Sequence, residues 1–203
     1  MPRLGHLVVV QDGLIGATGS LERLCGLLQL ELGPTATVMR SCSSHPWGGF
    51  PSFLGTLDGI PAGGNRLADE IERSIHGLVN LHSSHGSGQE RASTHSLTDY
   101  VCLSLVGMSL GGLFCRYAAG ELQRRSDSIA SQGVCRPGRG FIWIGHRTGF
   151  GVPPSSGGSL APPIKASLLN FVSLASPHLG VRGCIAGLTG YLAQTLGLGG
   201  PTV

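Results

Sequence analysis

Charged residues are scarce in this sequence, and arginine carries almost all of the basic charge. Only 12% of the residues are charged, and Lys165 is the only lysine. The arginines are scattered along the chain, so the net charge of +3 forms no basic patch of the kind that contacts nucleic acid. We therefore expect no nucleic-acid partner.

Paired cysteines, a secretory leader and a clear membrane span are also lacking. The six cysteines are dispersed without a C-x-x-C pair, which favours a reduced, intracellular protein. The apolar run Leu7–Val10 is too short for a signal peptide, and Gln11 and Asp12 end it. Gly183–Val203 carries no charge, but its six glycines dilute its hydrophobicity. We expect this stretch to be buried or to dock on a membrane surface rather than to cross a bilayer.

Glycine and proline, in contrast, are abundant. The chain of 203 residues has 34 Gly and 12 Pro, which predicts long loops, and its apolar fraction of 41% is typical of a globular protein. This length suits one α/β domain covering residues 1–203. Residues 126–165 have little regular pattern and are rich in Gly, Pro, Ser and Arg, so we expect a weakly ordered insertion there.

Hydrophobic patterning predicts strands that alternate with helices. The unbroken run Leu7–Val10 is typical of a strand buried on both faces of a parallel sheet. Further strands are expected at 35–39, 100–106 and 168–174, with a short one at 141–144. Helices are expected from an N-cap at Ser20 to a stop at Gly33-Pro34, at 65–81 and at about 110–124. This alternation predicts a doubly wound, mostly parallel sheet with right-handed crossovers.

The segment Gly107-Met-Ser-Leu-Gly111 falls between the third strand and the helix that follows it. The bare G-x-S-x-G pattern arises easily by chance in a chain this rich in Gly and Ser, so its context decides. A phosphate-binding loop is the alternative, but no Lys follows these glycines and they form no G-x-G-x-x-G pattern. We therefore predict a nucleophile elbow that presents the Ser109 hydroxyl above the sheet.

A serine nucleophile also needs an oxyanion hole. In a fold with a nucleophile elbow, the backbone N–H after the serine provides one donor, which is Leu110 here. The loop after the first strand provides the other, and Leu14 is the candidate. An ordinary strand–helix turn is the alternative interpretation of that loop.

Four sequence blocks together resemble a known family. They appear in order and cover most of residues 6–183 outside the expected insertion, which is more specific than any one block. The blocks are His6–Gly16, Asp58–Ile60 leading to Gly64–Ile71, Gly107–Leu113 with Arg116–Ala118, and Asn170–Gly183. Together they resemble the serine esterase, lipase-like family of α/β-hydrolases known from plants, algae and fungi.

This resemblance implies a fold of α/β-hydrolase type and a hydrolase of carboxylic esters of lipids or similar apolar acyl substrates. It implies that Ser109 attacks the acyl carbonyl and that the N–H groups of Leu14 and Leu110 hold the oxyanion. It implies no cofactor and no metal.

The sequence departs from the family pattern in two places. Asp12 stands where many hydrolases have His, and a carboxylate pointing at the oxyanion would be unfavourable. The triad is the larger problem, since an acid and then a histidine should follow the serine. We expect the strands that carry both partners to lie beyond Val203. After Ser109 the only acids and histidines are Glu121, Asp127, His146 and His178.

None of these four residues fits the expected place of a triad partner. We expect His178 to shape its loop, with a surrogate base role as the weaker alternative. Without a base Ser109 is a weak nucleophile, so a catalytically incomplete remnant or binding module is the alternative to a working esterase. His82, His85 and His95 match no structural zinc spacing, so we expect a solvated loop and no metal site.

Overall fold

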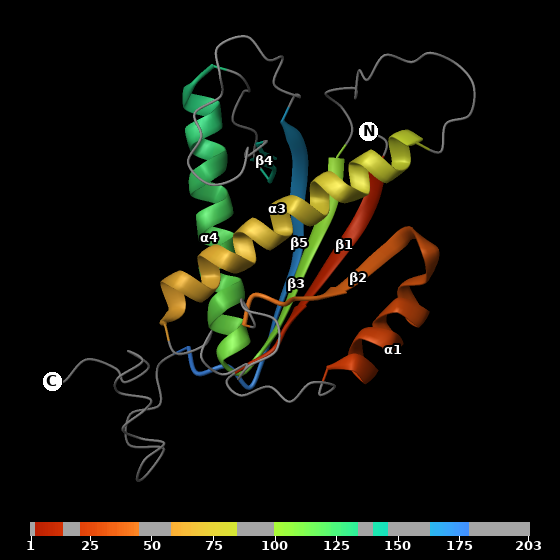
Figure 1. Ribbon diagram of the computed structural model, residues 1–203, viewed down its shortest axis with the longest axis vertical. Coiled ribbons are helices and arrows are strands. Elements are labelled where there is room, and N and C mark those ends of the chain that lie inside the picture. The colour runs from red at the N-terminus through yellow and green to blue at the C-terminus, as the bar shows by residue number, and fades with distance from the viewer. Residues whose placement is uncertain are drawn as a thin grey trace, which may run out of the picture.

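The computed structural model describes residues 3–13, 21–44, 58–84, 100–133, 140–145 and 163–178. Within these ranges five strands form one sheet in the order β2-β1-β3-β5-β4 (Figure 1). All neighbouring strands are parallel except β4, which runs antiparallel to β5. The strands are β1 (Arg3–Gln11), β2 (Ala36–Arg40), β3 (Tyr100–Met108), β4 (Ile142–Ile144) and β5 (Ile164–Leu174), and the α-helices are α1 (Glu22–Leu32), α3 (Ile60–Ser84) and α4 (Leu110–Ser131).

Helices cover both faces of this sheet. Successive side chains of β1 alternate between two cores: Leu7 and Val9 belong to the large one, which contains residues of α3 and α4. Val8 and Val10 belong to a smaller one on the opposite face, packed against α1. This arrangement explains why the run Leu7–Val10 is apolar at every position. The expected α/β fold with a mostly parallel, doubly wound sheet is confirmed.

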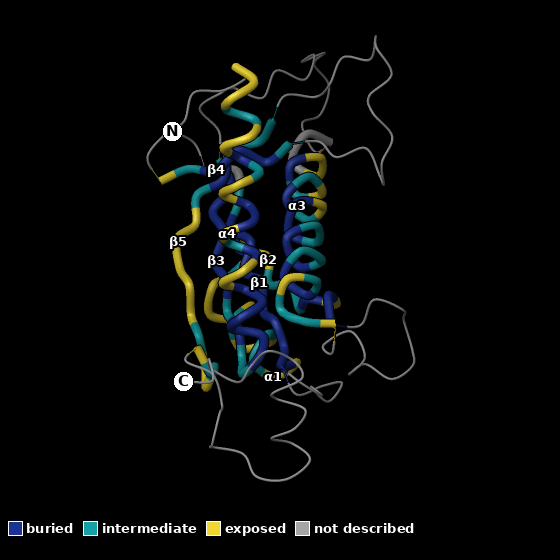
Figure 2. The backbone as a smooth tube through the Cα atoms, turned by 90° about the vertical axis from the view of Figure 1, so that its left-hand side faces the viewer, coloured by how far each residue is buried: buried dark blue, intermediate teal, exposed yellow. Residues whose placement is uncertain are grey.

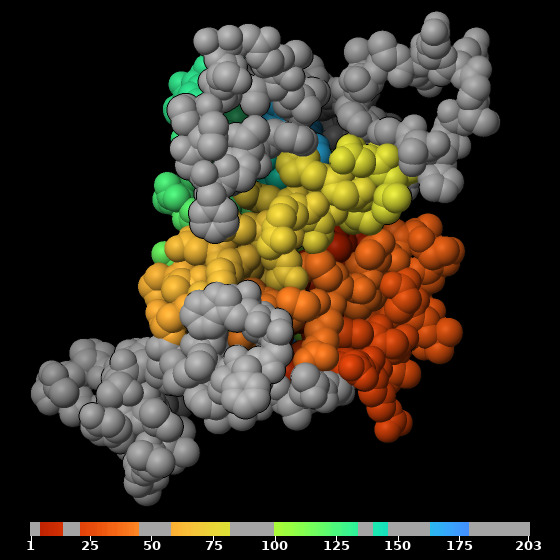
Figure 3. Space-filling view, viewed as in Figure 1, coloured from red at the N-terminus to blue at the C-terminus, as the bar shows by residue number. Residues whose placement is uncertain are grey.

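The helix α3 crosses α4 at close range. It lies across the face shown in Figure 3, beside the region formed by α1 and β2. The crossing depends on two glycines, because a Cβ at Gly63 would lie 2.6 Å from the Phe114 ring, and one at Gly64 would lie 2.7 Å from the Tyr117 Cβ. Phe114 is fully buried at this contact.

The strand β5 is much more exposed than the other central strands. Figure 2 shows it as a largely exposed strip along one side of the molecule. Leu168, Phe171, Val172 and Leu174 each keep about two fifths of their surface exposed. Within the described ranges, β5 has a second hydrogen-bonded neighbour only at 164–166, where β4 pairs with it.

Several elements are longer than the pattern predicted. The helix α4 continues to Ser131, into the segment expected to be an insertion, and β5 already begins at Ile164. Tertiary contact explains the longer helix, since Ser126 is buried and its Oγ accepts a hydrogen bond from the Trp143 N–H at 2.8 Å. The expected short strand near 141–144 is confirmed as β4.

Two expectations concern residues outside the described ranges: the N-cap at Ser20 and the charge-free stretch at the carboxyl end. Ser20, the expected N-cap, lies outside the described residues, and α1 has Leu21 at its N-cap without a side-chain hydrogen bond. Among the described residues no helix is both long and apolar enough to cross a bilayer. The charge-free stretch Gly183–Val203 lies outside them.

Candidate active site at the carboxyl end of the sheet

Ser109 lies at a sharp turn between β3 and α4. The strand ends at Met108 and the helix begins at Leu110, which leaves Ser109 alone between them with φ of 53° and ψ of −125°. A positive φ is strained for a residue other than glycine and persists only where the surroundings enforce it. Here the Ser109 N–H donates to the Leu174 carbonyl at 2.8 Å, and its carbonyl accepts from the Gly112 N–H at 3.1 Å. Ser109 is therefore held where β3 ends, at the edge of the sheet where the carboxyl ends of β1, β3 and β5 meet. This edge of the sheet is at the bottom of Figure 1.

The chain packs so tightly around this turn that glycine is required on both sides of it. A Cβ at Gly13 would lie 2.7 Å from the Ser109 Cβ and 3.2 Å from its Oγ. A Cβ at Gly111 would overlap the carbonyl oxygens of Gln11 and Asp12. The turn after β1 and the start of α4 are thus in direct backbone contact, with Ser109 between them.

The turn after β1 is held by its own side chains. Asp12 is buried, and its Oδ1 accepts a hydrogen bond from the Gly13 N–H at 2.8 Å. The Asp12 carboxylate therefore accepts from a backbone donor of this turn. Leu14, one of the two predicted oxyanion donors, lies outside the described residues.

Leu110, the other predicted donor, is buried and is the first residue of α4. An N–H in the first turn of an α-helix has no acceptor within the helix. The same end of the helix carries partial positive charge, which favours a developing negative charge nearby. The position of Leu110 is therefore compatible with an oxyanion donor next to Ser109.

The acids and the histidine that follow Ser109 in the described part are bonded elsewhere. Glu121 accepts hydrogen bonds from Arg124 and Arg125, and Asp127 accepts one from Gln123. The hydrogen bond from Arg124, helped by the one from Arg125 and opposed by burial, holds the pKa of Glu121 to about 2. Neither acid has a hydrogen-bond contact with a histidine in the described ranges, so the structure brings neither of them to Ser109.

His178 lies close to the elbow but pairs with another serine. Its Nε2 lies 2.6 Å from the Ser173 Oγ, and its ring packs at a tilt against Phe171. The expectation that His178 shapes its own loop agrees with these contacts. The i, i+5 spacing of Ser173 and His178 gave no sign of this pair in the sequence. His146 lies outside the described residues.

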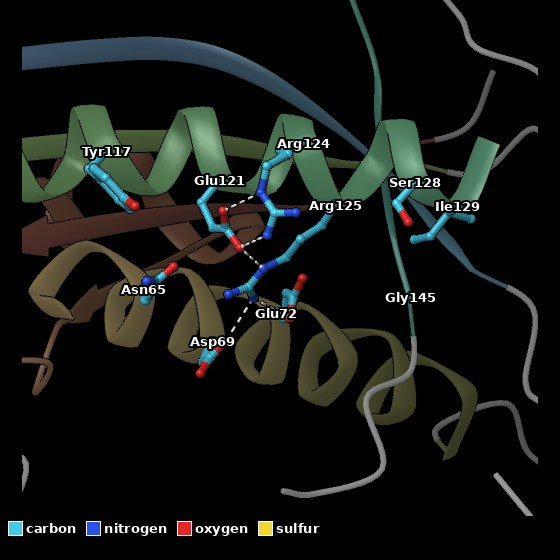
Figure 4. Close-up of a pocket in the computed structure, with 10 residues that line it drawn as sticks. All are labelled: Asn65, Asp69, Glu72, Tyr117, Glu121, Arg124, Arg125, Ser128, Ile129 and Gly145. Atoms are coloured by element: carbon cyan, nitrogen blue, oxygen red, sulfur yellow. Dashed lines mark hydrogen bonds and ion pairs between the residues drawn. The ribbon is translucent and has the colours of Figure 1, made fainter. Parts of the chain in front are cut away.

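A separate cavity of about 710 Å³ lies between α3 and α4, and Ser109 is not among its lining residues (Figure 4). At its centre Arg125 bonds to Asp69 at 2.7 Å, to Glu72 at 2.9 Å and to Glu121 at 2.7 Å. The pairing with Arg125 shows that Glu72, which is 6% exposed, joins the two helices.

No metal centre is formed by the described residues. Within those ranges, no group of three or more His, Cys, Asp or Glu side chains has an arrangement that could hold a metal ion. His85 and His95 lie outside the described residues, and so does the side chain of His82.

Comparison with known protein families identifies the family of this chain. The model of the family described as "Putative serine esterase" matches residues 3–195. This match covers the turn after β1, the elbow at Ser109 and the loop after β5 together. No curated protein and no solved structure matches the chain.

Proposed function

Because the chain belongs to this serine esterase family, we propose that it hydrolyses carboxylic esters with Ser109 as the nucleophile. One observation carries the proposal: Ser109 stands alone between a buried parallel strand and a helix, with a strained backbone and a partly exposed side chain. A nucleophile elbow has this conformation because the sharp turn lifts the serine hydroxyl out of the sheet.

The proposed reaction has two halves. The Ser109 Oγ attacks the acyl carbonyl carbon, a base takes its proton, and the alcohol leaves with a proton to give an acyl-serine. Water then adds to the acyl group, which leaves as a carboxylic acid and restores the serine hydroxyl. In each half the N–H groups of Leu110 and Leu14 stabilise the negative charge on the acyl oxygen.

We propose an apolar acyl ester, such as a lipid ester, as the substrate. A groove of about 430 Å³ follows the face of α4 that begins one turn after Ser109. Ile60, Leu113 and Tyr117 line its apolar part, and Arg116, Glu121 and Arg124 line the rest. The apolar part suits an acyl chain, and the charged side chains suit a polar group of the same ester. Faster hydrolysis of long-chain than of short-chain p-nitrophenyl esters would support this substrate class, and the reverse order would contradict it.

A fluorophosphonate probe tests the nucleophile directly. The probe labels only a serine that is activated, so wild-type protein should be labelled and Ser109→Ala should not. Ser131→Ala is the matched control. Ser131 is exposed and is the last residue of α4, and within the described residues its Oγ bonds only to the Ser128 carbonyl. Labelling that persists in Ser109→Ala would contradict the assignment.

A binding module that keeps the elbow is the second candidate function. The bonding of Glu121 to arginines and of His178 to Ser173 favours it, since neither side chain supplies a base to Ser109. Protein that binds a long-chain ester in a calorimetric titration, yet neither hydrolyses it nor reacts with the probe, would identify this function.

We also propose peripheral contact with a membrane through Gly183–Val203, which carries no charge. Flotation with lipid vesicles should be weakened when these residues are deleted. Unchanged flotation would remove this proposal without affecting the assignment of Ser109.

A further inference from the structure

Gln11, the last residue of β1, has a buried side-chain amide whose hydrogen bonds fix its orientation. The Nε2 donates to the Asp12 carbonyl at 3.0 Å and to the Ser44 Oγ at 2.7 Å. The Oε1 accepts from the Ser43 Oγ at 2.6 Å. Both N–H donors and the acceptor are thus used. A flipped amide would place its oxygen against the Asp12 carbonyl, which cannot donate, so this bond fixes the orientation. Since Gln11 is 0% exposed, water cannot replace them.

Two side chains hold the same peptide unit. The peptide between Asp12 and Gly13 accepts from the Gln11 Nε2 through its carbonyl, and it donates to the Asp12 Oδ1 through its N–H. A peptide unit is planar, so bonds at both of its ends fix the direction in which the chain continues. That chain passes directly beside Ser109, because a Cβ on Gly13 would lie 3.2 Å from the Ser109 Oγ.

The partners of Gln11 are anchored to the rest of the fold. Ser43 is tied to α3 once directly and once through Ser41: its carbonyl accepts from the Arg66 Nε at 2.8 Å, and its Oγ lies 3.0 Å from the Ser41 Oγ. Ser41 in turn donates to the Glu70 carboxylate at 2.6 Å. The Gln11 amide therefore connects the segment after β2 and the helix α3 to the turn beside Ser109.

We propose that Gln11 is a positioning residue for Ser109. Together with Asp12 it fixes the peptide that precedes Gly13, and so it sets the position of the Gly13 backbone that passes beside the Ser109 Oγ. Gln11 acts through this peptide and does not touch the reacting atoms. The inference rests on the proposed function, and the experiment below separates the two.

Gln11→Glu is the central variant. It keeps the size of the side chain but replaces the NH₂ donor by a carboxylate oxygen, which repels the Asp12 carbonyl. We expect the inactivation rate constant of the fluorophosphonate probe to fall by up to about 100-fold, since a small misplacement near the reacting atoms has an effect of that size. The binding constant of the probe should change little.

The pH dependence distinguishes positioning from general damage. Burial raises the pKa of a carboxyl group, and a protonated carboxyl can again donate to the Asp12 carbonyl. The rate at which the probe labels Gln11→Glu, divided by the rate for wild type, should therefore rise as the pH is lowered from 8 to 5. If this ratio of labelling rates stayed constant over the range, the proposed mechanism would be contradicted.

Gln29→Glu is the matched control. Gln29 also makes three hydrogen bonds through its amide, to the carbonyls of Gly33 and Ala36 and from the N–H of Val38. These bonds lie around the start of β2, away from the carboxyl end of the sheet. The same chemical change at this position should leave probe labelling at the wild-type rate.

Two variants of Asp12 test the same peptide in case the Gln11→Glu protein does not fold. Asp12→Ala removes the acceptor for the Gly13 N–H and should slow labelling, whereas Asp12→Asn keeps an oxygen acceptor and should restore most of the rate. Equal rates in the alanine and asparagine variants would overturn the role of this peptide.

Amide hydrogen exchange supplies a measurement that does not depend on activity. The Gly13 N–H should exchange at least about tenfold faster in Gln11→Glu than in wild type. In Gln29→Glu its exchange rate should equal that of wild type. If wild type is not labelled by the probe, the proposed function fails, and the exchange rates alone decide whether Gln11 holds the turn. If wild type and Gln11→Glu are labelled equally fast while Ser109→Ala is not, the esterase assignment stands and the inference about Gln11 is wrong.

Discussion

Replacing Glu121 with glutamine should destabilise the folded chain by an amount that depends on pH. Glu121 is 9% exposed, and its carboxylate accepts hydrogen bonds from Arg124 and Arg125. These bonds, the one from Arg124 first, hold its pKa to about 2, compared with an ordinary value of 4.5. At about 1.4 kcal/mol per pH unit, the lowered pKa sets an upper bound of about 3 kcal/mol of folding free energy at pH 7. Because the Arg124 side chain is 71% exposed and water screens its bond, we expect about 1–2 kcal/mol.

The direction of the pH dependence follows from the lowered pKa. The unfolded chain binds a proton at Glu121 more readily than the folded one, so the contribution is fully present above pH 4.5. It shrinks as the pH falls and is lost as the pH approaches 2. The free energies of unfolding of wild type and Glu121→Gln should therefore differ most at pH 7 and converge in acid. Urea unfolding followed by circular dichroism at several pH values measures this difference.

Glu22→Gln is the control for this measurement. The carboxylate of Glu22 lies 3.6 Å from the Arg40 guanidinium, but its side chain is 73% exposed, so this pair contributes at most about 1 kcal/mol. The reasoning would be refuted if Glu121→Gln lowered the free energy of unfolding at pH 7 by no more than Glu22→Gln does. It would also be refuted if Glu121→Gln lowered the free energy of unfolding equally at pH 7 and pH 3.

Two further predictions concern packing and thiol chemistry. Gly63→Ala should lower the free energy of unfolding by about 1–3 kcal/mol, because the added Cβ would lie 2.6 Å from an aromatic ring of α4. Gly77→Ala on the same helix meets nothing within 4 Å and should instead raise it by up to about 1 kcal/mol, which thermal unfolding of both variants checks. Burial raises the pKa of the Cys115 thiol to about 12, so at pH 8 the folded protein should react with iodoacetamide at the exposed Cys42 well before Cys115. Mass spectrometry of the labelled peptides measures the order, and equal rates at the two thiols would contradict the burial of Cys115.

Much of the fold could be predicted because local patterns in the sequence have a direct physical cause. The run Leu7–Val10 is apolar throughout because helices cover both faces of β1. The helical spacing of Leu67, Ile71 and Ile75 predicted α3, and all three side chains lie in the core. Element ends were predicted less well, since α4 extends to Ser131 through contacts with β4 that no local pattern reveals.

Part of the candidate site could be predicted from the sequence, and part could not. The turn at Ser109 could be predicted because the G-x-S-x-G pattern falls between a buried-strand pattern and a helix. A Cβ at Gly111 would overlap the backbone of Gln11 and Asp12, which is why glycine stands there. The hydrogen bonds of Gln11 gave no such indication, since their partners Ser43 and Ser44 lie more than 30 positions away along the chain. The pairing of Arg125 with Asp69 and Glu72 likewise has no local sign in the sequence, since these partners lie more than 50 positions away along the chain.

By itself, the sequence determined the α/β class, the order of the strands and helices, and the turn that carries Ser109. These features follow from hydrophobic periodicity and from the steric demands of glycine, which act between residues close together in the chain. Only the tertiary structure decided which polar groups are buried and bonded to one another. It turned the Asp12 carboxylate toward a backbone N–H, paired His178 with Ser173 and fixed the amide of Gln11. A buried polar group must find a partner wherever the fold brings one near, and that partner is not marked in the local sequence.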